Sequence, residues 1–299
     1  MGATNNSIAS NFFLGMANVV YPAYIIERWH TVLLAYCVAF LSAGVNLWVS
    51  YLLHKISKFI LIWNVPSFVI ITVTLLATTS TITSSPYRLC FKTSKDTAGL
   101  GTAVTAIVGI LQACFGMCCY DGPSHMTEEM NSATTEAPKT IILAVCLGTV
   151  TGFAFSLTLC FCIGDIAATA QSSTGVPVIQ IMDDSTGSKV ATCILASLIA
   201  VIVTVAGVNI LAEGSRSTFA FARDHGLPFS PTCSKVERKS QVPVNAVFLT
   251  LAVQLALGAI EFGTVTGLPT VVSISTAGFW KYHLFFLCPA NPYPSIRYG

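Results

Sequence analysis

Charged residues are scarce in this sequence. Asp, Glu, Lys and Arg make up only 9% of its 299 residues, whereas a soluble globular domain carries about 25%. Hydrophobic residues make up 54%, and the mean hydropathy is +0.72. The composition therefore excludes an ordinary soluble domain and predicts a protein that crosses the membrane several times. The net charge of +2 is too small to favour a nucleic-acid partner.

The sequence also lacks the motifs of metal sites and of common enzymes. It has no C-x-x-C pair and no Cys/His spacing typical of zinc. Most of its eleven cysteines lie in apolar runs, where thiols behave as small hydrophobic groups. No H-E-x-x-H, G-x-S-x-G or paired-Asp motif occurs in those runs. We therefore expect no metal, no cofactor and no enzymatic activity.

Long apolar runs, each close to the roughly 20 residues that cross a bilayer as a helix, recur along the chain. We predict spans at residues 31–53, 59–79, 99–120, 140–163, 190–212 and 244–260, with a weaker seventh at 267–286. Residues 12–26 are apolar but interrupted, so they are either an interfacial segment or the tail of another span. Residues 1–279 then form one transmembrane domain. Residues 280–299 are an atypical tail of the kind that an intron read-through or a frameshift would produce.

The distribution of Lys and Arg predicts the orientation of the chain. The loop at residues 213–242 is the most basic and is expected in the cytoplasm, whereas the acidic loop at 164–189 is expected outside. Alternating spans then place the basic residues 54–58 inside and the N-terminus outside. An external N-terminus without a signal peptide is explained most simply if an odd number of upstream helices is missing.

The third predicted span ends in a polar interruption. The apolar run from Thr102 stops at Tyr120-Asp121-Gly122, and residues 123–130 behind it are expected to form a second half-helix. A carboxylate beside a glycine is costly in lipid and is tolerated only where it is buried in protein or lines a wet cavity. Discontinuous helices of this kind build the central site of many secondary transporters.

Two separated motifs resemble those of fungal amino acid/choline permeases, which are GABA-permease-like members of the amino acid–polyamine–organocation (APC) superfamily. The first is CCYDGPSHMTEEM at residues 118–130, and the second is GSRSTFAFARDHGLPFSP at residues 214–231. The resemblance implies an all-α inverted-repeat fold of twelve helices. The spans here look like helices four to ten, so helices one, two, most of three, eleven and twelve would be absent.

The resemblance also implies a substrate site at the interrupted helix. Phe115, Gly116, Met117 and Tyr120 would line it, with Gly116 permitting close approach and an aromatic ring facing an ammonium group. Asp121 is the candidate charge partner, and its alternative role is a helix cap at the membrane surface. On pattern alone, Phe115 and Met117 could equally be ordinary core or lipid-facing residues.

The candidates for coupling and gating surround the same region. They are His125, Glu128, Glu129, Arg216 and Arg223. The two glutamates could carry protons or pair with the arginines as an inner gate, although a plain cytoplasmic pairing with Lys139 or the basic loop is the simpler interpretation. His125 titrates near neutral pH and could relay protons; an ordinary polar histidine is the simpler role.

Two other groups of polar residues have alternative explanations. Thr204, Gly207 and Asn209 in the fifth span are expected to pack against neighbouring helices rather than to face a cavity. Asn5-Asn6-Ser7 matches a glycosylation sequon, whose use would depend on its side of the membrane.

Together these features predict a secondary active permease for amino acids or related organocations such as choline, GABA or polyamines. The resemblance implies alternating access, proton coupling, and a multi-pass protein of the plasma membrane, with an internal membrane as the alternative. The competing prediction is a truncated pseudo-permease or nutrient-sensing membrane protein that does not transport. This alternative arises because the family's first helix, which would be absent here, contributes half of the substrate cradle.

Overall fold

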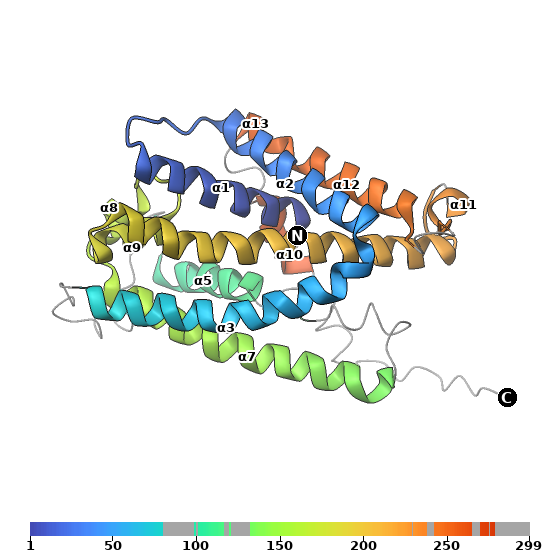
Figure 1. Ribbon diagram of the computed structural model, residues 1–299, viewed down its shortest axis with the longest axis horizontal. Helices are drawn as coiled ribbons and strands as arrows, with labels where there is room; N and C mark the ends of the chain where they lie inside the picture. The colour runs from blue at the N-terminus through green and yellow to red at the C-terminus, as the bar shows by residue number, and fades with distance from the viewer. Residues whose placement is uncertain are drawn as a thin grey trace.

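The computed structural model describes residues 1–79, 99, 101–116, 120, 132–228, 230–237, 242–264, 270–274 and 276–278, and every regular element among them is a helix (Figure 1). The prediction of an all-α protein is therefore confirmed. The elements are α1 (Gly2–Val20), α2 (Arg28–Trp48), the 3-10 helix η1 (Ser50–Leu52), α3 (Leu53–Thr78), α5 (Thr102–Gly116), α7 (Ala133–Cys162), α8 (Ile166–Ala170), α9 (Pro177–Thr186), α10 (Lys189–Arg223), α11 (Ser230–Cys233), α12 (Val244–Gly258) and α13 (Ile260–Gly263).

Five helical segments in the described part of the chain are long and apolar enough to cross a membrane. They are α2, α3, the Thr134–Cys162 part of α7, α10, and the combined Val244–Gly263 segment of α12 and α13. Each overlaps one of the predicted spans, and α5 overlaps the predicted span at 99–120. Of the weaker span at 267–286, only residues 270–274 and 276–278 lie within the described residues, and these are helical.

The helix α10 is the centre of the bundle. In Figure 1 it lies between α1, α2 and α12 on one side and α3 and α7 on the other. The helices α1, α2, α10 and α12 all contact one another and form a four-helix group. The helix α7, by contrast, packs mainly on α3. Small residues such as Ala39 and Ala43 let α2 approach α10 and α12 closely, where they pack with Leu211, Val247 and Leu251.

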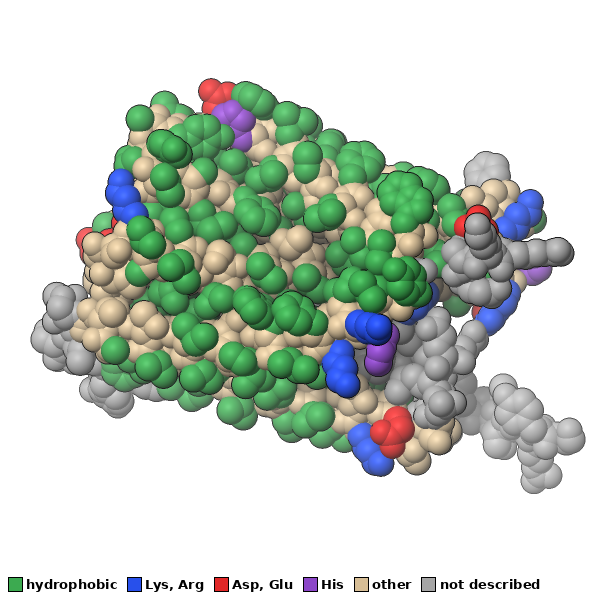
Figure 2. All heavy atoms as spheres, viewed as in Figure 1, with side chains coloured by type: hydrophobic (Ala, Val, Ile, Leu, Met, Phe, Trp, Pro, Cys, Tyr) green, Lys and Arg blue, Asp and Glu red, His purple; other side chains and the backbone are tan. Residues whose placement is uncertain are grey.

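The outer surface of the bundle is apolar over its middle. Figure 2 shows hydrophobic side chains covering this part, with charged side chains toward the two ends of the helices. No residue of the most apolar stretch of α7 is buried, and Ile142, Leu143 and Val150 are each more than 60% exposed. In water such a surface would cost free energy, so it fits contact with lipid tails.

The aromatic side chains of α2 mark the two edges of the apolar band. Trp29 lies in its first turn and Trp48 is its last residue, and both are exposed, at 49% and 81%. Nineteen helical steps separate them, which is a rise of about 28 Å and close to the thickness of a bilayer's hydrocarbon core. Exposed Trp and Tyr are enriched at these interfaces.

The charge distribution distinguishes the two ends of the bundle. Six of the eight described Lys and Arg residues lie at the end where α2 meets α3 and where α10 finishes. Those six are Lys55, Lys58, Lys139, Arg216, Arg223 and Lys235. The opposite end carries five of the nine described Asp and Glu residues. By the positive-inside rule, the first end is the one expected to face the cytoplasm.

The helix α10 is longer than the predicted span, and this corrects the interpretation of the second motif. The span was expected to end at residue 212 and to be followed by a loop, but α10 continues to Arg223. Its 35 residues rise about 52 Å, which exceeds the hydrocarbon core. Arg216 and Arg223 therefore project from a helix that extends beyond the bilayer. His225, at φ 59, and Gly226 end this helix.

Two further segments are more ordered than the sequence suggests. Residues 12–26 contain the second half of α1, which packs on α10 and α2 inside the bundle, so an interfacial segment is the wrong alternative. The acidic loop at 164–189 contains α8 and α9. The helix α9 buries Ile179 and Met182 against α3 and α10.

Candidate functional site

The predicted substrate site is only partly within the described residues. The helix α5 ends at Gly116, and Tyr120 is half-buried. Met117, Asp121, His125, Glu128 and Glu129 lie outside the described residues, as does the side chain of Phe115. Among the described atoms, nothing lies within 4 Å of a Cβ built on Gly116. Packing against the described residues therefore does not require a glycine there.

The two candidate gating arginines lie on the last turns of α10. Arg216 is half-buried, and Arg223 lies in the final turn, where its charge is favourable to the helix dipole. Arg223 Nε lies 3.7 Å from Asp224 Oδ1, with the two side chains 48% and 72% exposed. An exposed pair of this length contributes little to stability. A pairing with Glu128 or Glu129 stays a prediction.

A buried polar junction joins α1, α2, α10 and α12. The side chain of Asn5 donates to the carbonyl of Val203, at 2.9 Å. Asn46, which is 4% exposed, donates from Nδ2 to the carbonyl of Val208, at 3.0 Å, and to that of Ser42, at 2.8 Å. Hydrogen bonds between helices in a membrane contribute about 0.6 kcal/mol each on average. Their main effect here is to fix the register of α1 and α2 along α10.

Gly207 is the point of closest approach in this junction. A Cβ at this position would lie 2.9 Å from Asn5 Nδ2, 3.2 Å from Asn6 Oδ1 and 3.5 Å from Ser42 Oγ. Asn6 and Ser42 are 4% and 1% exposed, and these two oxygens have no hydrogen-bond partner within the described residues. The prediction that Gly207 packs against neighbouring helices is confirmed, whereas for Thr204 it is wrong, because Thr204 lines a groove between α2, α3 and α10. Asn209 packs as well, because its Oδ1 accepts from Ser57 Oγ of α3 at 3.0 Å.

Further polar contacts join α1 to α12, α13 and α2. Asn6 Nδ2 donates to Gln254 Oε1 at 3.2 Å, and Ser7 Oγ donates to Glu261 Oε2 at 2.6 Å. Ser10 Oγ donates to the carbonyl of Thr31 at 2.7 Å. The Asn5-Asn6-Ser7 sequon is therefore part of the bundle interior. A glycan on Asn5 would remove its contact with α10, so this fold does not favour use of the sequon.

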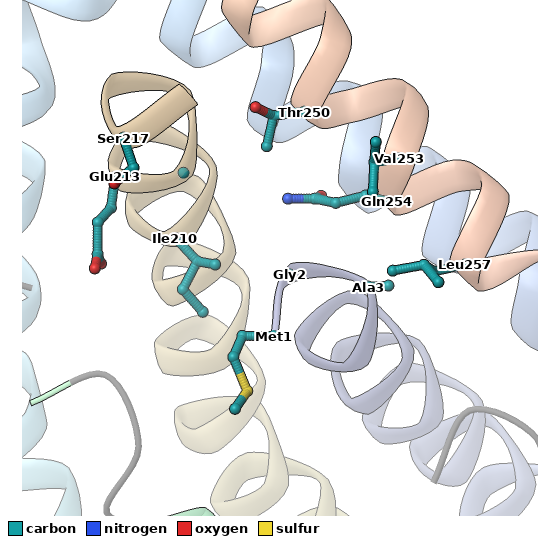
Figure 3. Close-up of a pocket in the computed structure, with 11 residues that line it drawn as sticks. Met1, Gly2, Ala3, Ile210, Glu213, Ser217, Thr250, Val253, Gln254 and Leu257 are labelled. Carbon is teal, nitrogen blue, oxygen red and sulfur yellow. The ribbon is translucent and has the colours of Figure 1, made fainter. Parts of the chain in front are cut away.

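A cavity of about 300 Å³ lies where α1 begins, between α10 and α12 (Figure 3). Its polar lining residues are Glu213, Ser217, Thr250 and Gln254. Figure 3 shows Gln254 reaching from α12 toward α10, while the carboxylate of Glu213 points away from it. Met1 and Gly2 form part of the wall, so the first residues of the chain bound this space. We do not assign the substrate to it.

Sequence reasoning missed the polar junction as a unit. The available signal was the presence of amide side chains in apolar runs, such as Asn46 inside the predicted span at 31–53. Such residues are costly in a membrane unless they face a partner within the protein. What the sequence does not show is that Asn5, Ser42 and Gly207, which are far apart along the chain, meet at one place.

The fold and its surface define an integral membrane protein that crosses the bilayer several times. The family model of the amino acid permeases matches residues 2–290 of the chain. The chain therefore belongs to the amino acid permease family. This is a family of transporters rather than enzymes, and it agrees with the resemblance seen in the two motifs.

Several curated proteins are similar to the chain over most of its length. A Macrophomina phaseolina protein provisionally named as an amino acid/polyamine transporter is 50% identical over 280 residues, which cover 94% of this chain and 61% of that protein. The choline transporter of Saccharomyces cerevisiae is 27% identical over 275 residues, covering 91% of this chain and 48% of that protein. An amino-acid permease of Arabidopsis thaliana is 25% identical, covering 81% and 48%. The chain thus spans about half to three fifths of the length of these relatives.

Proposed function

We propose that the chain acts in secondary active transport of amino acids or related organocations such as choline, GABA or polyamines. The match of the amino acid permease model to residues 2–290 carries the proposal. The relatives named for choline and for amino acids or polyamines share an ammonium group as the common feature of their named substrates. Recognition of that group is what the site is expected to provide.

The proposed substrate site is the end of α5 and the segment that follows it. Asp121 would pair with the ammonium group, and Phe115 or Tyr120 would face it through a cation–π contact. Gly116 and Met117 would complete the lining. Gly116 would let the substrate approach the backbone closely.

Alternating access is proposed to move the α5 region against the four-helix group. The helices α1, α2, α10 and α12 are joined by buried amide hydrogen bonds and by a glycine contact. By contrast, none of the described helices packs extensively on α5. A rigid group beside a weakly packed helix is the arrangement that a rocking mechanism needs. His125, Glu128, Glu129, Arg216 and Arg223 remain the proposed coupling and gating set.

Uptake of radiolabelled substrate into proteoliposomes tests this function. The protein would be the chain itself and a longer version completed with the additional sequence of the Macrophomina phaseolina relative. We expect uptake of at least one of choline, GABA, a polyamine or an amino acid, stimulated by an inwardly directed proton gradient. Uptake that does not depend on the proton gradient would contradict proton coupling. No uptake of any of these compounds by either protein would contradict the transport proposal and favour the non-transporting alternative.

The plasma membrane is the proposed location. This location follows if the protein takes up amino acids or related organocations from outside the cell. An internal membrane is the alternative. Fluorescence microscopy of a tagged chain beside a plasma-membrane marker would distinguish the two.

A further inference from the structure

A second hollow of the bundle is an apolar groove of about 470 Å³ between α2, α3 and α10. It is lined by Leu41, Val45, Leu52, Lys55, Ile56, Phe59, Thr204, Val205 and Val208. All but Lys55 and Thr204 are apolar. The hydroxyl of Thr204 donates to the carbonyl of Ala200 in its own helix, at 2.7 Å. The groove therefore offers hydrocarbon contacts and very little hydrogen bonding, which does not suit a polar solute.

The mouth of the groove lies at the edge of the membrane. Trp48 is the last residue of α2, and Tyr51 lies between α2 and α3. Each is 81% exposed, as is typical of aromatic residues at the membrane interface. Lys55 follows them in the first turn of α3, and Phe59 lies one turn further along the same face. Along α3, a cation at the interface is thus followed directly by the apolar part of the groove.

The described charge at this mouth is positive. His54, Lys55 and Lys58 are all exposed in the first two turns of α3. In the described part of the chain, no carboxylate lies within ion-pair distance of either lysine. The helices α2 and α3 contain no acidic residue, and α10 has only Glu213, which is not among the lining residues of the groove.

The leaflet at this end is the one with the most anionic lipid. The same end carries six of the eight described Lys and Arg residues, which predicts that it is cytoplasmic. The cytoplasmic leaflet has a negative surface potential that attracts Lys and Arg near the membrane, and basic pockets between helices on this side bind anionic headgroups.

We propose that this groove binds an anionic glycerophospholipid of the cytoplasmic leaflet. Its phosphate and headgroup lie on Lys55 and Lys58, and one acyl chain lies along Phe59, Val45 and Val205. The bound lipid bridges α2, α3 and α10, so it links the four-helix group to α3. This inference does not depend on the proposed substrate or on transport.

Native mass spectrometry of the purified chain with phosphatidylserine or phosphatidylcholine tests the proposal. We expect the chain to retain phosphatidylserine preferentially, and Lys55→Ala/Lys58→Ala to weaken its binding about 30-fold. The matched control is Lys139→Ala/Lys235→Ala, which removes the same charge from the same end but away from the groove. This control should bind as the parent does, and all four sites are exposed enough that folding should be retained.

A second variant tests the apolar part of the site. Val205→Trp fills the groove and should abolish retention of phosphatidylserine. Ile142→Trp, on the lipid-facing side of α7, should not change it. Equal retention of phosphatidylserine and phosphatidylcholine would overturn the proposal. Equal loss in the two double-lysine variants would overturn it as well, and so would a second copy of the chain occupying the groove in place of lipid.

Discussion

Gly207 shows how one residue without a side chain organises the centre of the bundle. Three polar atoms from α1 and α2 approach the position where its Cβ would be. The glycine thereby lets Asn5 reach a carbonyl of α10, and it lets α2 cross closely enough for Asn46 to reach another. The close approach, rather than any special backbone angle, explains the glycine.

Gly207→Ala should therefore destabilise the protein, although alanine is the better helix former. Overpacking of this kind costs about 1–3 kcal/mol, which exceeds the 0.5–1 kcal/mol that alanine gains over glycine inside a helix. Thermal unfolding of the detergent-solubilised protein measures the effect.

Gly148→Ala in α7 is the matched control, because no described atom lies within 4 Å of a Cβ at that position. It should be neutral or slightly stabilising. Equal melting temperatures for the two variants would show that Gly207 is not a close contact.

At this scale, the sequence predicts residue types better than residue partners. Small and polar residue types identify Gly207 and Asn209 as packing residues, whereas the sequon at Asn5 does not reveal the contact that Asn5 makes with α10. The difference is that Asn5 meets Val203 across 198 positions of sequence, and no local pattern contains that information. For the candidate substrate site, Tyr120 and Gly116 are placed, while Asp121 and its neighbours keep only the support of the motif.

The helix α10 shows why element boundaries are harder to predict than elements. The sequence placed its end at residue 212, because Glu213, Arg216 and Arg223 are charged and a hydrophobic span does not include them. A helix does not end where the bilayer ends, however. The stretch after Gly214 keeps apolar residues such as Phe219 and Ala222 at helical spacing, and Ala222 is buried. Hydropathy thus gave the length of the membrane-spanning part and not the length of the helix.

A proline in this extension tests whether it is helical. Ser217→Pro removes a backbone donor and clashes with the preceding turn, at a cost of about 3 kcal/mol or more in a helix interior. We expect a clear drop in the melting temperature.

Val236→Pro is the comparison, because Val236 lies outside any helix and is exposed. It should leave the melting temperature nearly unchanged. If Ser217→Pro were equally harmless, the segment would be a loop, as first expected from the sequence.

At the scale of the whole molecule, charge and aromatic residues give the chain a defined direction in the membrane. The basic end contains the start of α3, the end of α10 and the anionic-lipid groove proposed above. The opposite end contains α8, α9 and the acidic residues Asp183 and Asp184. This direction stays a prediction, and it needs only the sequence, because the rule counts residues near the ends of spans and does not require their contacts.

Cysteine labelling in sealed cells checks the direction. Asp184→Cys should react with a membrane-impermeant maleimide from outside, above the background of the parent chain. Lys235→Cys should react only after the membrane is permeabilised. Both side chains are exposed, so access to the reagent depends on the side of the membrane. The reverse pattern of labelling would show that the orientation is inverted.

The central claim is that an ammonium-containing substrate is held at the segment after α5. Its most direct test is substrate uptake by Asp121→Asn in the longer version described above. The comparison is Asp184→Asn, which removes the same charge from α9. Surface expression of both variants should match that of the parent. The account predicts that Asp121→Asn abolishes uptake while Asp184→Asn retains it. Unchanged uptake by Asp121→Asn would contradict the claim and return Asp121 to the role of a helix cap.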